Sequence, residues 1–65
     1  MDKEIKAAEK AIAAHAEAMR LDLDGESESV GVFHLLASLI EYCDTYAIDM
    51  DVEIENARHF VRSKT

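Results

Sequence analysis

The sequence predicts a small all-α protein, a three-helix bundle in a single domain over residues 1–65, with dimerisation left open. Three observations predict this class. The chain has no proline and only two glycines, so little interrupts helix formation. Segments rich in alanine and leucine dominate. Apolar residues recur at helical spacing in three segments, which are 2–22, 30–46 and 50–62.

The first predicted helix covers residues 2–22. Asp2 can cap its N-terminus, and Glu4 lies in the first turn, where the helix dipole favours negative charge. Gly25 is expected to end the helix through a left-handed cap. One face is apolar and mostly small, which lets another helix approach closely. It is formed by Ile5, Ala8, Ile12, His15 or Ala16, and Met19.

The second predicted helix, residues 30–46, is the most apolar. Ser27 or Ser29 can cap its first free N–H groups, and Glu26 and Glu28 suit its dipole. Such a wide apolar surface must be covered on more than one side, by two partner helices or by a second copy of the chain. The surface comprises Val32, Phe33, Leu36, Leu39, Ile40, Cys43 and Ala47, widened by Leu35, Tyr42 and Tyr46.

The third predicted helix, residues 50–62, begins after Asp49, which is a good N-cap. Asp51 and Glu53 lie in its first turn, and basic residues lie at its C-terminal end, as the dipole favours. Its apolar face is formed by Met50, Ile54, Ala57 and Val61, with Phe60 beside them. Three helices with short connections predict either an up-down-up bundle or an open arrangement completed by dimerisation.

Length and composition limit the class of protein. A chain of 65 residues buries little surface, so its stability is marginal. Cys43 is the single cysteine and is expected to be a small buried side chain. No segment approaches the ~20 apolar residues of a membrane span, and the N-terminus has no apolar signal-peptide core. We expect a soluble, cytoplasmic protein, located in a bacterial host cell if a phage encodes it.

Charge is unevenly distributed along the chain. There are 14 acids and 7 bases, which disfavours direct binding to nucleic acid or to an anionic membrane. No Lys or Arg occurs between Arg20 and Arg58, whereas ten acids do. Tyr42 and Tyr46 are candidate anchors, because aromatic residues dominate binding hot spots, although core packing is an equal alternative for them. The candidate partner-binding acids are Asp22, Asp24, Glu26, Glu28, Glu41, Asp44, Asp49, Asp51, Glu53 and Glu55.

The sequence predicts no catalytic, metal-binding or cofactor-binding residue. Calcium loops starting at Asp22 or Asp49 would lack the glycine at position six and the carboxylate at position twelve. The three histidines lie on three different predicted helices, without the paired spacing of a zinc site. Cys43 has acidic rather than basic neighbours in the sequence, which disfavours nucleophilic catalysis. We therefore expect a protein that is not an enzyme and needs no cofactor.

Residues 35–63, LLASLIEYCDTYAIDMDVEIENARHFVRS, resemble the tail of MazG-type all-α nucleotide pyrophosphohydrolases. The similarity lies in residues 46–49 (YAID) and 56–60 (NARHF). That family binds magnesium through E-E-x-x-E and a later E-x-x-D motif. The first half is absent here, and Glu41-x-x-Asp44 lies too close to the YAID turn to match the second. Alignment on that turn places the ligand positions near Gly31 and His34, so the resemblance implies at most an inactive nucleotide-binding protein.

The base-free span from Leu21 to Ala57 also resembles a class of small acidic all-helical inhibitors encoded by phages, including anti-CRISPR proteins and nucleic-acid mimics. DNA carries one negative charge per about 1.7 Å of duplex axis, so its binding proteins expose Lys and Arg. An acidic surface can occupy such a groove and exclude the nucleic acid.

Three functions follow from these patterns. The first is a non-enzymatic, anti-CRISPR-like inhibitor that binds a basic nucleic-acid-handling protein or complex and blocks its nucleic-acid site. The second is a small homodimeric helical adaptor module with no electrostatic target, whose stability depends on protein concentration. The third is the inactive MazG-like nucleotide-binding protein.

Overall fold

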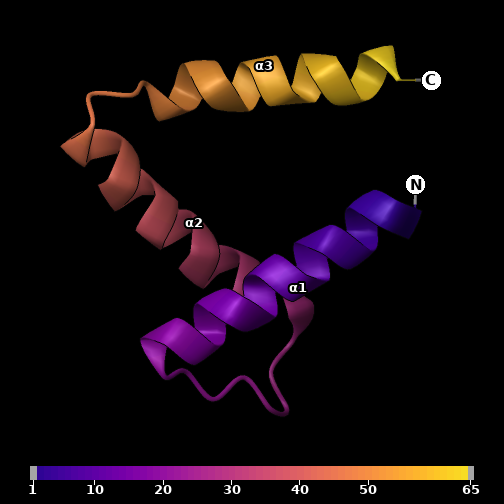
Figure 1. The fold of residues 1–65 in the computed structure, drawn as a ribbon, viewed down its shortest axis with the longest axis vertical. Coiled ribbons are helices and arrows are strands. Elements are labelled where there is room, and N and C mark those ends of the chain that lie inside the picture. Colours follow the sequence, from indigo (N-terminus) through magenta and orange to yellow (C-terminus); the bar gives the residue numbers. More distant parts are fainter. Residues whose placement is uncertain (1, 65) are drawn as a thin grey trace.

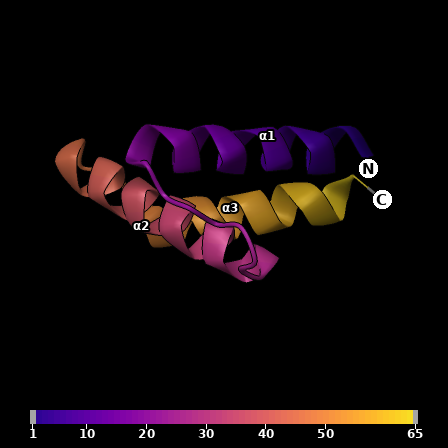
Figure 2. The same ribbon diagram turned by 90° about the horizontal axis from the view of Figure 1, so that it is seen from below.

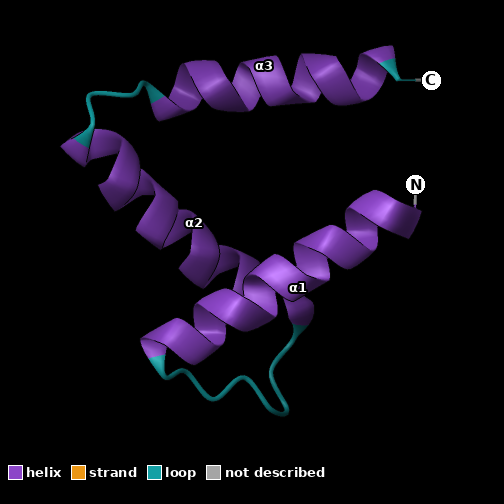
Figure 3. Ribbon diagram, viewed as in Figure 1, coloured by secondary structure: helices purple, strands orange, loops and turns teal. Residues whose placement is uncertain are grey.

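The computed structural model describes residues 2–64 and confirms a small all-α fold of three helices. Helix α1 spans Asp2–Met19, α2 spans Glu28–Thr45 and α3 spans Met50–Ser63. Residues 20–27 and 46–49 connect them, and the described residues contain no strand (Figure 3).

The helices form an open and flat arrangement. Helix α1 crosses α2, and α3 leaves the far end of α2 and returns toward the N-terminus of α1 (Figure 1). Viewed at 90° to this, α1 lies on one side of α2 and α3 (Figure 2). The molecule measures 34 × 32 × 16 Å along its principal axes. The three helices therefore form a small and open all-α bundle, as the sequence predicts.

The crossing of α1 and α2 depends on small residues. Gly31 of α2 is buried, and a Cβ atom built on it would lie 2.7 Å from Cγ2 of Ile12. The same Cβ would lie 3.5 Å from Cδ1 of Leu23. Ala16 of α1 is also buried at this crossing. His15 Nε2 and Ser38 Oγ share a hydrogen bond of 2.7 Å between the two helices. The absence of a side chain at position 31 is what lets the helices approach this closely.

Helix α1 ends three residues earlier than predicted, and Gly25 is not its cap. Arg20 takes the left-handed conformation instead, with φ 57°, and the Leu21 N–H donates to the Ala16 carbonyl at 2.9 Å. This is the hydrogen-bond pattern of a Schellman cap, normally completed by glycine. Gly25, with φ 81°, lies in the turn of the connection.

The C-terminus of α2 has the same type of cap. Ala47 has φ 56°, and the Ile48 N–H donates to the Cys43 carbonyl at 2.8 Å. At the other end of α2, Ser27 occupies the N-cap position without capping, and its hydroxyl bonds the Ser29 hydroxyl at 2.9 Å. The helix starts at Glu28, two residues earlier than predicted, and neither serine caps it through its side chain.

Helix α3 begins as the sequence predicts. The Asp49 side chain accepts a hydrogen bond of 3.2 Å from the Val52 N–H. Cys43 Sγ donates to Met50 Sδ at 3.6 Å, which links the end of α2 to the start of α3. Lys64 forms an ion pair with Glu4, so the two chain ends meet.

The core is very small for a chain of this length. Within residues 2–64, the buried apolar side chains are Ala16 and Cys43. The accessible surface is 5783 Å², whereas a compact monomer of 7.3 kDa exposes about 4,200 Å². The difference, about 1,600 Å², arises because α2 is covered by α1 along one side and α3 meets α2 only near its own N-terminal end.

Candidate interaction surfaces

The structure divides the ten candidate acids between two regions at opposite ends of α2 (Figure 1). Residues 22–28 supply Asp22, Asp24, Glu26 and Glu28 from the connection between α1 and α2. The second region comprises Glu41, Asp44, Asp49, Asp51, Glu53 and Glu55, at the end of α2 and along α3. All ten are exposed, but they do not form one continuous surface.

A concavity lies between α1 and the connection that follows it. Six carboxylates line it, and no Lys or Arg does. Its floor is apolar or small and includes Ile12, Ala16 and Gly31. We call this concavity the acidic groove, and its carboxylates are Glu9, Glu17, Asp22, Asp24, Glu26 and Glu28.

Two of these carboxylates were missing from the candidates predicted by sequence. Glu9 and Glu17 have basic neighbours along α1, so in the sequence they are typical of solvated ion pairs on a helix surface. Their separation of eight residues, slightly more than two turns, places them along one side of α1. The sequence gives no indication that the connection folds back along this side.

Asp22 has a structural role within the groove. Its Oδ1 accepts a hydrogen bond of 3.0 Å from the Asp24 N–H, and the Glu26 N–H donates to the Leu23 carbonyl at 3.0 Å. These bonds form two successive turns, in the manner of an Asx-turn followed by a β-turn.

Within residues 2–64, no group of three or more His, Cys, Asp or Glu side chains is placed to hold a metal ion.

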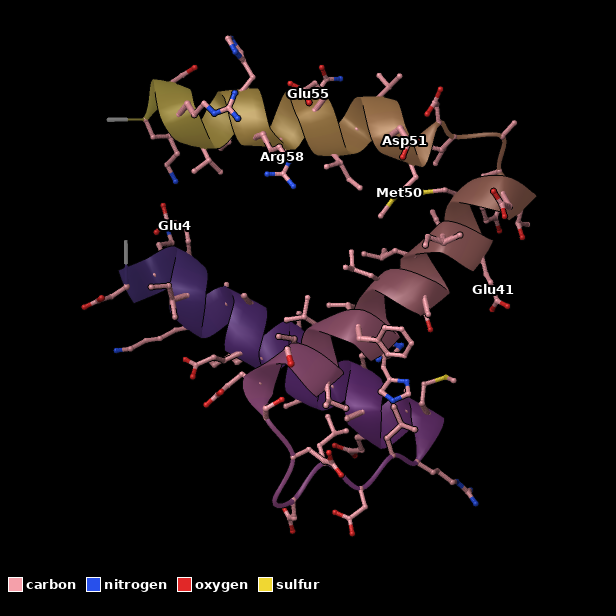
Figure 4. The ribbon with its side chains drawn as sticks, turned by 180° about the vertical axis from the view of Figure 1, so that it is seen from behind. Glu4, Glu41, Met50, Asp51, Glu55 and Arg58 are labelled. Atoms are coloured by element: carbon pink, nitrogen blue, oxygen red, sulfur yellow. The ribbon has the colours of Figure 1, made fainter. Side chains whose placement is uncertain are left out.

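Tyr42 and Tyr46 lie on the surface of α2 rather than in a core. Their side chains are 57% and 64% exposed, and their ring centroids are 4.8 Å apart. The pair therefore presents apolar area to solvent next to Glu41, which points outward from α2 (Figure 4). This position is compatible with the anchor role predicted for the tyrosines.

A second concavity lies where α2 meets α3. Its apolar residues come from both helices and from the connection between them, and Asp44, Asp49 and Asp51 line it as well. Met50 points toward α2 here (Figure 4). We call this surface the apolar corner, and its apolar residues are Leu36, Ile40, Ile48, Met50 and Ile54.

The two chain ends are joined by charge rather than by packing. The hydrogen bond from Lys64 lowers the pKa of Glu4 to about 2, from an ordinary value of 4.5. Both side chains are well exposed, so the pair adds little to stability.

Comparison with known proteins finds no matching family model, no matching curated protein and no matching solved structure. No helix within residues 2–64 is both long and apolar enough to cross a membrane.

Proposed function

We propose that the protein is a non-enzymatic inhibitor, similar to anti-CRISPR proteins, that uses its acidic groove to bind a basic nucleic-acid-handling protein. The observation that supports this proposal is the lining of the groove, where six carboxylates from α1, the connection and α2 meet without a Lys or Arg among them. Bound there, the protein would occupy the surface that the partner uses for nucleic acid.

The electrostatics of the groove favour this kind of partner. Carboxylates gathered in a concavity focus their field and raise the local concentration of cationic groups. Arg binds a carboxylate through two parallel hydrogen bonds, as it binds a phosphate. A protein surface that exposes Arg and Lys for nucleic acid is therefore also complementary to this groove, and the net charge of −7 adds attraction at longer range.

The groove also lies on the best-packed part of the molecule. The contact of Gly31 with Ile12 and the hydrogen bond between His15 and Ser38 fix α1 against α2. The turn formed by Asp22 orders the connection. A partner consequently meets a groove whose backbone is already ordered, which reduces the entropy lost on binding.

The proposal is tested by capture from a bacterial lysate on tagged protein, followed by elution with a salt gradient. We expect a nucleic-acid-binding protein that elutes sharply as salt rises and that added DNA or RNA releases at constant salt. Glu26→Lys should release it at clearly lower salt. Glu41→Lys makes the same change of charge outside the groove and should elute like the natural protein.

The proposal is contradicted if capture is insensitive to salt and to added nucleic acid. It is also contradicted if Glu26→Lys and Glu41→Lys release the partner at the same salt concentration. Circular dichroism of both variants should match the natural protein, because both residues are exposed and neither is a cap.

A further inference from the structure

Within residues 2–64, helix α3 is covered mainly at its N-terminal end, where Met50 and Ile54 lie against α2. None of its residues is buried. The Cys43–Met50 contact ties its start to α2, and Lys64, which follows it, forms an ion pair with Glu4 of α1. A helix of 14 residues is marginal in water on its own, so most of its stability must come from packing. Its apolar face of Met50, Ile54, Ala57 and Val61 leaves Val61 63% exposed. The helix therefore needs a partner surface.

The area left uncovered on each chain is about twice what a partner buries in a standard interface, and it lies in the range of obligate dimers. The chain exposes about 1,600 Å² more than a compact monomer of its mass. Standard protein interfaces bury about 800 Å² per partner, and obligate dimers bury more, with a more apolar composition. The uncovered side chains on α2 and α3 are apolar in this way, and the apolar corner joins them into one surface.

The charges of α3 indicate which partner fits. Its first half carries acids and no base, and its second half carries bases and no acid. Asp51, Glu55, Arg58 and Arg62 all lie along the same side of the apolar face, given 100° of rotation per residue. If a second α3 lies antiparallel, Asp51 and Glu55 of each copy face Arg58 and Arg62 of the other. The helix is thus complementary to itself about a two-fold axis.

We propose that the protein forms a symmetric homodimer in which the α3 helices of two copies pack antiparallel. The apolar face of each α3 lies against the other and over the apolar corner, where Leu36, Ile40 and Ile48 complete the interface. The charged side of α3, on which Figure 4 marks Asp51, Glu55 and Arg58, forms the rim. This interface does not involve the acidic groove and does not depend on the proposed function.

Sedimentation equilibrium of the purified chain tests the dimer directly. We expect a mass of twice 7.3 kDa at micromolar concentration, with dissociation on dilution. A helical protein that sediments as a monomer throughout this range would overturn the proposal. Because no other protein is present, this result is independent of whether a nucleic-acid-handling partner exists.

A charge exchange tests the antiparallel arrangement. Asp51→Arg with Glu55→Arg makes the charged side wholly basic, and Arg58→Glu with Arg62→Glu makes it wholly acidic. Each variant alone should self-associate at least about tenfold more weakly than the natural chain, because like charges then face each other. An equimolar mixture of the two should restore the dimer.

Recovery in the mixture shows that the single variants still fold, since an unfolded chain could not pair. Glu26→Lys, in the acidic groove, serves as the control and should dimerise like the natural chain. If both α3 variants alone dimerise as well as the natural chain, or if their mixture stays monomeric, the antiparallel α3 interface is overturned.

Discussion

The crossing of α1 with α2 and the free helix α3 use apolar residues in opposite ways. At the crossing, small residues are buried, and Gly31 brings two backbones close together. Along α3, larger residues such as Ile54 and Val61 remain exposed. The crossing is therefore packed within one chain, whereas α3 leaves apolar area exposed. Substitutions in the two regions should accordingly differ in whether their effects depend on protein concentration.

The largest expected effect is at the crossing. Gly31→Val places a branched side chain where even a Cβ would lie 2.7 Å from Ile12, whose methyl group is held close to its own backbone. We expect a loss of about 3 kcal/mol in the free energy of unfolding, at the upper end for overpacking, measured by urea denaturation. Ala37→Val, at an exposed position of α2, is the control and should lose less than about 0.7 kcal/mol. Equal losses in the two variants would contradict the close crossing.

The next effect concerns α3 and should depend on protein concentration, unlike the effect at the crossing. Ile54→Asp introduces a charge into the apolar face of α3 and should remove about 1 kcal/mol of interface stability, because Ile54 is 37% exposed in the single chain and only that part remains to be buried. Its melting temperature should no longer rise with protein concentration. Val52→Asp, on the opposite face of the same helix, is the control and should keep that dependence. A melting temperature of Ile54→Asp that still rises with concentration would argue against burial of this face.

A smaller effect of opposite sign is expected at the end of α2. Ala47 has φ 56°, where a Cβ is strained and glycine is not. Ala47→Gly should raise the free energy of unfolding by about 0.5–1 kcal/mol, after the greater freedom of glycine in the unfolded chain is subtracted. The same substitution at Ala37, inside the helix, should destabilise by a similar amount. If both variants lose stability, Ala47 does not have this left-handed conformation in solution.

The smallest effect concerns the chain ends. Because the Lys64 hydrogen bond lowers the pKa of Glu4 from 4.5 to about 2, the ion pair contributes fully above pH 4.5. Its contribution should fade as pH falls from 4.5 toward 2 and weaken with added salt. Glu4→Gln should remove this part of the pH dependence. Parallel curves for the natural chain and the variant over this pH interval would show that the pair does not persist in solution.

The sequence predicted the parts of this fold that depend on local chemistry. Helical spacing of apolar residues located all three helices, and Asp49 marked the start of α3 correctly because its side chain caps the helix. The end of α1 was misplaced because an arginine, Arg20, occupies the left-handed position that glycine usually signals. Arginine rarely adopts a positive φ, so the residue type did not predict the left-handed conformation of Arg20.

The candidate surfaces were less predictable, because they depend on how the helices cross. The alternating acids of residues 22–28 predicted that the connection between α1 and α2 belongs to a binding surface. Whether those acids would meet Glu9 and Glu17 depended on the path of the connection, which turns at Asp22 and Leu23. The change from acids to bases along α3 is visible in the sequence. It indicates a partner surface only once the structure shows that no residue of this helix is buried.

The placement of the acidic groove and the apolar corner at opposite ends of α2 has a consequence for valency. The groove uses Glu28 and Gly31 near the start of α2, whereas the corner begins at Leu36 and continues into α3, so the two surfaces share no residue. In a dimer joined through α3, each chain would keep its groove free, because no residue of α3 lines it. The assembly would then be bivalent, and a target with two basic surfaces at a matching distance would bind it by avidity. Two individually weak grooves could in this way hold a large complex that neither would retain alone.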